Sequence, residues 1–164
     1  MKTTTLLVTI IVGFLMSNLQ AQETIWFDSD WSVSAKEKAV YYRPAPQKKD
    51  NGFWIVDYYI SGKKQKEGFS TNANPNNESY HGVVNYFYEN GNKSQTVTYV
   101  KGKLNGNFFK FYPSKELEIA GKYSDGMREG IWKKFYKNGK IKEKGKYREG
   151  DKVGVWKTFY KNDY

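Results

Sequence analysis

The sequence predicts an all-β protein, an elongated antiparallel sheet of stacked β-hairpins with a small N-terminal cap. Two observations support this fold class: a 24-residue internal repeat and a composition rich in rings and glycine. The 164 residues include 5 Trp, 14 Tyr, 10 Phe and 15 Gly. Aromatic and β-branched residues favour strands, whereas closely spaced glycines oppose helices. A stack of hairpins in which each unit contacts mainly its neighbours satisfies both observations.

The overall composition excludes several other classes of protein. The chain has no Cys, which excludes a disulfide scaffold, a thiolate metal site and a cysteine nucleophile. A mean hydropathy of −0.81 and 27% charged residues argue against a protein that is integral to the membrane. The many rings can bury enough area to argue against disorder.

The N-terminal residues have the pattern of a secretory signal peptide. Lys2 supplies a positive charge, residues 6–16 form an apolar run, and the small Ala21 precedes Gln22. The run is short for a membrane span. We therefore expect residues 1–21 to be a signal peptide cleaved after Ala21, and the mature chain to be periplasmic or secreted.

Residues 22–50 are less regular and are expected to form the N-terminal cap. Trp26, Phe27 and Trp31 are apolar enough to pack against the first hairpin. Residues 34–37 have the spacing of a capping box, which predicts one short helical turn. A strand is expected over residues 39–42, ended by the prolines that follow Arg43.

The repeat array is expected over residues 51–164. An opening glycine, an apolar or aromatic residue two places later and a Phe-Tyr pair recur with a period of 24 residues. Four units in this period start near Gly82, Gly106, Gly130 and Gly154, and a degenerate earlier copy, separated from them by the polar residues 71–79, starts near Gly52. The last two units supply the residues that define the repeat, which are Trp132, Phe135, Tyr136, Gly139, Gly145, Tyr147, Trp156, Phe159 and Tyr160.

Each unit is expected to be a β-hairpin. Asn138-Gly139 predicts a two-residue turn in which both residues have positive φ. That turn places Tyr136 opposite Ile141, Lys134 opposite Glu143, and Trp132 opposite Gly145, whose missing side chain would let the indole lie over the backbone.

The alternation of side chains along the strands predicts what each face carries. We expect Trp132, Tyr136, Ile141 and Tyr147 on one face, and Phe135 with Lys133, Lys142, Lys144 and Lys146 on the other. Asp125-Gly126 and Glu149-Gly150 mark the turns to the next hairpin. Lys115 and Asp163 replace the turn glycine, which predicts different turns in those units.

The units G-x-W-x-x-F-Y-x-N-G-K-x-x-x-x-G-x-Y-x-x-G resemble the MORN-repeat variant of bacterial proteins, a group often described as YwqK-type antitoxins of toxin–antitoxin systems. The resemblance covers about residues 51–164 and is clearest over residues 82–160. It implies consecutive β-hairpins and supplies no catalytic motif. An antitoxin-like role, in which the chain neutralises a partner protein, is one function that it implies.

The sequence gives no catalytic, cofactor or metal site. His81 precedes a hairpin with no nearby partner, and the carboxylates are scattered along the chain. The turn carboxylates lack the ligand density of a calcium-binding repeat. A small hydrolase using Asp57 and Glu89 is the least favoured of the functions considered.

Charge is unevenly distributed along the chain. Residues 22–100 hold 9 Lys and Arg against 9 Asp and Glu, whereas residues 101–164 hold 17 against 8. A solvated face that prevents aggregation of sheet edges is one interpretation. The other is contact with an anionic partner, through the candidate residues Lys133, Lys140, Lys142, Lys144 and Lys146.

We expect an exported, non-enzymatic scaffold or protein-binding module, whose final strand, residues 154–160, offers an open edge for strand addition. The alternative is electrostatic binding to an anionic lipid or polysaccharide surface. Nucleic acid is disfavoured by the export signal. The sequence implies no cofactor.

Overall fold

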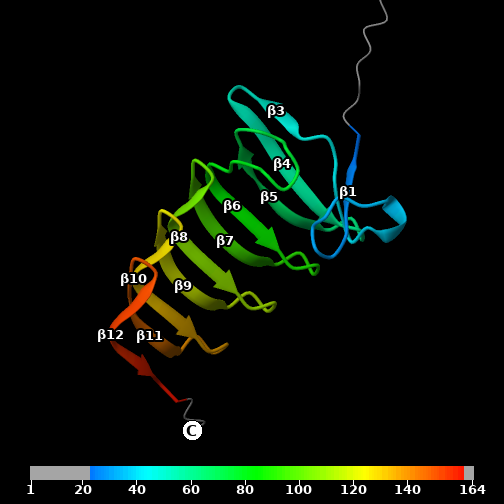
Figure 1. Ribbon diagram of the computed structural model, residues 1–164. Coiled ribbons are helices and arrows are strands. Elements are labelled where there is room, and N and C mark those ends of the chain that lie inside the picture. Colours follow the sequence, from blue (N-terminus) through cyan, green and yellow to red (C-terminus); the bar gives the residue numbers. More distant parts are fainter. Residues whose placement is uncertain (1–22, 161–164) are drawn as a thin grey trace, which may run out of the picture.

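The computed structural model describes residues 23–160. They form one 12-stranded antiparallel sheet, which confirms the predicted fold class (Figure 1). The order is β1-β2-β4-β5-β6-β7-β8-β9-β10-β11-β12, with β3 beside β4. The predicted signal peptide and Asp163 lie outside the described residues. The strands are β1 (Ile25–Phe27), β2 (Tyr41–Arg43), β3 (Gln47–Lys49), β4 (Gly52–Tyr59), β5 (Lys64–Ser70), β6 (Gly82–Phe87), β7 (Lys93–Val100), β8 (Lys103–Phe111), β9 (Leu117–Ser124), β10 (Met127–Phe135), β11 (Ile141–Arg148) and β12 (Asp151–Thr158).

The N-terminal segment extends the sheet beyond the first hairpin. Strand β1 pairs with β2, and β2 pairs with one half of β4, opposite Tyr58 and Tyr59. Strand β3 pairs with the other half of the same β4 edge. The expected helical turn is the 3-10 helix η1 (Lys36–Lys38), but Ser34 does not cap it, because the N-cap is Ala35 and has no side-chain bond.

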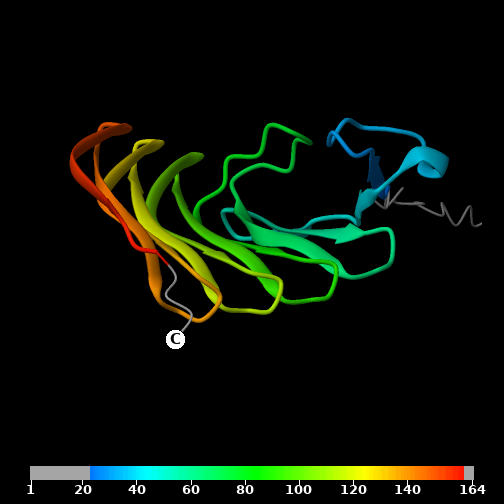
Figure 2. The same ribbon diagram turned by 90° about the horizontal axis from the view of Figure 1, so that it is seen from below.

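The hairpins follow one another along the sheet, and their strands are bowed along their length (Figure 2). In β10–β11 the predicted pairs Trp132↔Gly145 and Lys134↔Glu143 are confirmed. The predicted pair of Tyr136 and Ile141 is wrong, because the register shifts after Lys134 and places Phe135 opposite Ile141.

The turn chemistry explains that shift. Gly139 has a positive φ of 79°, whereas Asn138 does not. The N–H of Gly139 donates to the carbonyl of Tyr136, and the N–H of Tyr136 donates to the carbonyl of Lys140. This is a longer turn, closed by one left-handed glycine, in place of the predicted two-residue turn.

Turns with two left-handed residues lie at the opposite end of the strands. Both residues have positive φ at Lys101-Gly102, Asp125-Gly126 and Glu149-Gly150. These two-residue turns join one hairpin to the next, as expected for Asp125-Gly126 and Glu149-Gly150. Positive φ at both central residues is the geometry that matches the twist of the flanking strands.

Lys115 forms the same turn as Gly139, so the prediction of a different turn there is wrong. Its φ is 85°. Its N–H donates to the carbonyl of Tyr112, and the N–H of Tyr112 donates to the carbonyl of Glu116, as in the glycine-closed turn. The backbone of Lys115 is therefore in a left-handed conformation, which costs free energy for a residue with a side chain.

The aromatic row runs along one face and explains the internal glycines. Trp132 and Tyr147 lie on the same face, as predicted, and meet edge to face at 5.7 Å. The indole above Gly145 belongs to Trp156, whereas Trp132 lies above Gly121. The expected role of Gly145 under Trp132 is therefore wrong, because each indole covers the glycine of the preceding strand.

A tyrosine ladder joins each unit to the next. In four of the units, the hydroxyl of the second residue of the aromatic pair donates to the carbonyl of a Phe about one repeat later in the chain. The four bonds measure 2.7–2.8 Å and join Tyr59 to Phe87, Tyr88 to Phe111, Tyr112 to Phe135, and Tyr136 to Phe159. The recurring Tyr is therefore a connector between neighbouring hairpins.

The most deeply buried side chains lie in the N-terminal part of the sheet. Ile55, Tyr80, Val84 and Val97 form the core cluster. Beyond Val97, Trp132 and Tyr147 are the buried apolar residues of the described chain. The C-terminal hairpins thus contribute a thin aromatic layer and leave their other face to solvent.

Candidate functional site

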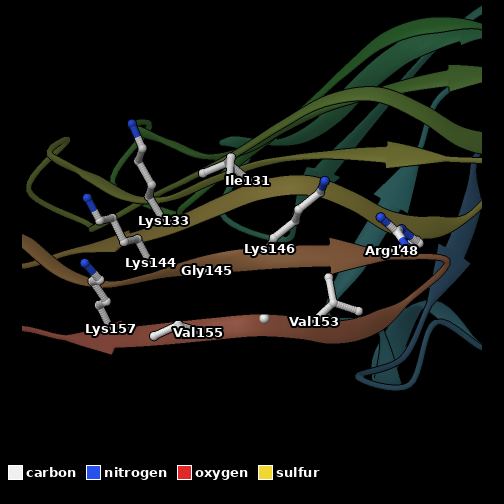
Figure 3. A pocket seen from close by; sticks show the side chains of 10 residues that line it. Ile131, Lys133, Lys144, Gly145, Lys146, Arg148, Val153, Val155 and Lys157 are labelled. Carbon is white, nitrogen blue, oxygen red and sulfur yellow. The ribbon is translucent and has the colours of Figure 1, made fainter.

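A basic groove lies on the open face of β10, β11 and β12 (Figure 3). Its volume is about 740 Å³. Five cationic side chains line it, together with the apolar residues Ile131, Val153 and Val155 and the backbone of two glycines. The cations are Lys133, Lys144, Lys146, Arg148 and Lys157.

Three of these lysines lie directly opposite one another across the strands. Lys133 pairs in register with Lys144, and Lys144 pairs with Lys157. Like charges at opposite positions destabilise a sheet. No carboxylate is among the residues that line this groove, so the lysine row has no counter-ion within it.

The earlier hairpins show that the scaffold does not need this lysine row. The corresponding pairs are Asn85 with Thr96 in β6–β7, and Phe109 with Ala120 in β8–β9. Uncharged residues therefore occupy the same register positions without loss of the fold. The fold of these hairpins therefore does not require the three lysines, whose mutual repulsion opposes it.

On the opposite face of the same strands, two lysines share a carboxylate. Glu143 pairs with Lys134 at 2.8 Å and with Lys152 at 3.3 Å. The hydrogen bond from Lys134, with help from Lys152, lowers the pKa of Glu143 below its usual value. In these neighbouring strands, the lysines of one face thus have a carboxylate partner, whereas the lysines of the other face form a row without one.

Three of the five predicted contact residues line the groove, namely Lys133, Lys144 and Lys146. Lys140 follows the turn and is exposed outside it. Lys142 lies over the Tyr136 ring, 5.6 Å from its centre. Sequence reasoning missed Arg148 and Lys157, although a 24-residue shift from Lys133 gives Lys157 directly.

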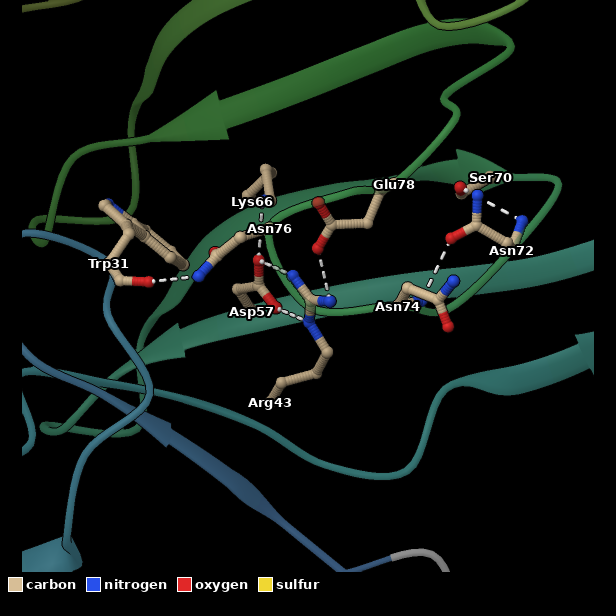
Figure 4. Close-up of polar contacts among 9 residues, drawn as sticks. All are labelled: Trp31, Arg43, Asp57, Lys66, Ser70, Asn72, Asn74, Asn76 and Glu78. Atoms are coloured by element: carbon tan, nitrogen blue, oxygen red, sulfur yellow. Dashed lines mark hydrogen bonds and ion pairs between the residues drawn. The ribbon is translucent and has the colours of Figure 1, made fainter.

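A second polar cluster is buried in the N-terminal part of the sheet (Figure 4). Asp57 accepts two bonds from Arg43, at 2.6 and 3.0 Å, and pairs with Lys66 at 2.8 Å. Arg43 also pairs with Glu78 at 2.5 Å. Burial alone would lower the pKa of Arg43, but Asp57 and Glu78 outweigh it and raise the pKa.

The four side chains of this cluster, Arg43, Asp57, Lys66 and Glu78, form a buried quartet with a structural role. Two cations face two carboxylates, and Glu78 comes from the loop of residues 71–79, which also bonds through Asn76 to the carbonyl of Trp31 at 2.8 Å. The quartet therefore fastens this loop and the N-terminal segment to β4 and β5. Asp57 is fully buried and engaged, which leaves it no access to a substrate.

Among residues 23–160 no group of three or more His, Cys, Asp or Glu is placed to hold a metal ion. In the same residues, no helix combines the length and the apolar character needed to cross a bilayer.

The comparison with known families agrees with the hairpin repeat. The model of the MORN repeat variant matches residues 80–101, which contain the hairpin β6–β7, and residues 128–149, which cover the hairpin β10–β11 except for Met127. No curated protein matches the chain. The chain thus belongs to the class of β-hairpin repeat proteins, built around one open sheet.

More particularly, two of its hairpins match the MORN repeat variant, which confirms the resemblance at these two repeats. Repeats of this kind generally serve as non-enzymatic binding modules.

Proposed function

We propose that this chain is an exported, non-enzymatic protein-binding module that holds an anionic partner in the basic groove of β10–β12. The observation that carries the proposal is the row of Lys133, Lys144 and Lys157, which lie in register with no carboxylate in the groove. A partner carboxylate placed over this row would relieve the repulsion and gain charge-assisted bonds. An antitoxin-like role would be one case of such binding.

The test compares two triple variants with the same change in charge. Lys133, Lys144 and Lys157 are changed to Glu in one, and the exposed Lys49, Lys63 and Lys93 in the other. Binding of poly-L-glutamate is measured by fluorescence anisotropy at increasing salt. We expect salt-sensitive binding that the first variant loses and the second retains. Equal binding by both variants would refute the proposal.

The natural partner is sought with the same pair of variants. Each is immobilised and exposed to envelope and culture fractions, and retained proteins are identified after cross-linking by mass spectrometry. A true partner is retained by the wild type and the control variant, and is lost with the groove variant.

An anionic lipid surface is the second candidate. Ile131 and Val155 are 57% and 79% exposed beside the lysines of the groove. Apolar side chains flanked by cations suit a negatively charged bilayer surface. Sedimentation with phosphatidylserine vesicles separates the candidates, because Ile131→Ser with Val155→Ser would weaken vesicle binding and leave poly-L-glutamate binding unchanged.

The export part of the proposal is supported by Lys2, the apolar run of residues 6–16 and Ala21. Mass spectrometry of the protein recovered from its native cells is expected to give an N-terminus at Gln22. A protein that retains residues 1–21 and stays with cytoplasmic proteins would overturn it.

A further inference from the structure

The two edges of the sheet differ in how they are covered. Strand β1 has three residues, and its outer side is occupied, since Phe27 bridges Val33 and the N–H of Ser34 donates to the carbonyl of Trp26. Strand β12 has eight residues and pairs with β11 on one side. No described residue pairs with its other side, which borders the basic groove.

The backbone of β12 presents free donors and acceptors along this edge. The N–H of Phe159 donates to the carbonyl of Lys142 in β11. Backbone groups alternate in direction along a strand. The N–H groups of Thr158 and Trp156 therefore point toward the open edge.

The repeat supplies a template for a strand added at this edge. Strand β12 corresponds to β10, shifted by 24 residues, and β10 receives β11 on the equivalent side. In that pair Ile131 faces Lys146, Trp132 faces Gly145, and Gly130 faces Tyr147. An added antiparallel strand would thus meet Val155, Trp156 and Gly154 at the same three positions.

We propose that β12 captures an extended partner segment with the pattern acidic–small–acidic–aromatic, which pairs antiparallel with it as a thirteenth strand. This inference rests on the proposed function and names the chemistry of its partner. The segment corresponds to residues 144–147 of the template, Lys-Gly-Lys-Tyr, with the two lysines replaced by carboxylates.

Charge complementarity sets the acidic positions. The first acidic residue would lie opposite Lys157, as Lys144 lies opposite Lys133. The second would lie opposite Val155, on the same face. Both carboxylates would then border the groove cations, in place of the lysines that the repeat has at the equivalent positions.

The aromatic position follows from the ring contacts of the template. Tyr147 meets Trp132 edge to face, with the ring centres 5.7 Å apart. The equivalent ring of the added segment would meet Trp156 in the same way. Such pairs contribute about 1 kcal/mol beyond the area that they bury.

A second copy of this chain is a poor occupant. Residues 28–31, Asp-Ser-Asp-Trp, have the required pattern. However, the carboxylate of Asp28 accepts the N–H groups of Asp30 and Ser32, and Trp31 stacks on Tyr41 with the ring centres 4.4 Å apart. This segment is held in a turn, so the occupant is a different, extended chain.

The test uses three fluorescein-labelled ten-residue peptides with Glu-Gly-Glu-Tyr, Lys-Gly-Lys-Tyr or Glu-sarcosine-Glu-Tyr at the centre. Sarcosine keeps both charges and removes the N–H that would donate to Trp156. We expect the first peptide to bind, the second not to bind, and the third to bind about tenfold more weakly, as the loss of one buried hydrogen bond predicts. Equal binding of the first and third peptides would overturn strand addition.

A pair of protein variants tests the edge itself. Thr158→Pro removes an outward N–H, whereas Thr158→Val keeps it. Only the proline variant should lose the Glu-Gly-Glu-Tyr peptide, while both should retain poly-L-glutamate. If poly-L-glutamate binds and the peptide series shows no selectivity, the strand proposal fails and the proposed function stands. If neither ligand binds, both fail.

Discussion

The N-terminal and C-terminal parts of this sheet are stabilised by different kinds of interaction. Strands β4 and β5 are covered by the loop of residues 71–79 and by the N-terminal segment, and they bury both apolar and charged side chains. The C-terminal hairpins rely on ring stacking and on bonds from one hairpin to the next. The first region has a buried core and buried ion pairs of its own, whereas the second depends on its neighbours, as expected in a repeat array.

The two regions also differ in net charge, which distinguishes the part that stabilises the fold from the part that we propose binds a partner. The well-buried region is electrically balanced, since residues 22–100 carry as many cations as carboxylates. The thin C-terminal region carries the excess of +9, given by 17 basic and 8 acidic residues. Unrelieved charge is thus concentrated where a partner can reach it.

The largest effect is expected at the buried quartet. Asp57→Ala would leave Arg43 and Lys66 buried without their shared carboxylate, which costs about 3–5 kcal/mol. Urea denaturation measures this loss. The control is Glu118→Ala, which removes a half-exposed surface pair with Lys110 and should cost less than about 1 kcal/mol. Similar losses in the two variants would contradict the anchoring role of the quartet.

Crowding by an added methyl group should be more costly inside the array than at its end. A Cβ on Gly121 or on Gly145 would lie 2.2 Å from an indole ring. Trp132 is held between two strands, so Gly121→Ala should cost about 3 kcal/mol. Trp156 lies on the edge strand, which can move, so Gly145→Ala should cost about 1 kcal/mol. Chemical denaturation of both variants checks the order.

Alkaline pH should destabilise the N-terminal core. Burial, with the nearby charge of Glu78, raises the pKa of Tyr80, and burial beside Tyr99 raises that of Tyr86. An unfolded Tyr has a pKa of about 10. The contribution of these two tyrosines to stability should be constant below about pH 10 and fall above it by about 1.4 kcal/mol per pH unit for each tyrosine. Urea unfolding at several pH values measures the slope, and Tyr86→Phe should reduce it.

The tyrosine ladder should give a smaller effect that depends on position. Tyr112→Phe removes a 2.7 Å bond to the carbonyl of Phe135 and should cost about 1 kcal/mol. Tyr136→Phe removes the exposed bond to Phe159 and should cost less. Hydrogen exchange of β12 provides a second measurement, because faster exchange is expected with Tyr136→Phe and not with Tyr112→Phe.

The smallest effect has the opposite sign. Lys115 occupies a left-handed conformation that glycine adopts freely. Lys115→Gly should therefore raise stability by about 1 kcal/mol, and Gly139→Lys should lower it by a similar amount. The change in Tm of both variants tests this. A decrease in Tm for Lys115→Gly would show that the lysine contributes a contact worth more than the strain.

The sheet and its repeat could be predicted because the pattern is local. Each hairpin signal falls within one 24-residue unit, so the strands and the pairs of Trp132 and Lys134 follow from alternation. The turn at Asn138-Gly139 was mispredicted, because the same dipeptide suits a longer turn with one left-handed residue. The indole above Gly145 was assigned to the wrong Trp, because that contact joins two successive units.

The candidate site was predicted in part for the same reason. Lys133, Lys144 and Lys146 share a face within one hairpin, which alternation detects. Arg148 continues the same alternation by one step in β11, and Lys157 follows from the 24-residue shift of Lys133, so both were within reach of the repeat pattern. The buried quartet could not be found, since Arg43, Asp57 and Glu78 are distant in sequence and each resembles an ordinary surface residue.

The tyrosine ladder has a consequence for how such a chain changes in length. Its last three bonds each join a residue to the carbonyl 23 positions later, and all three lie within the 24-residue period. Duplicating or deleting one whole unit therefore renews the same bonds at the new junction. The array can gain or lose hairpins in a single genetic step. The buried contacts of the N-terminal region and the basic groove of the last strands would not change.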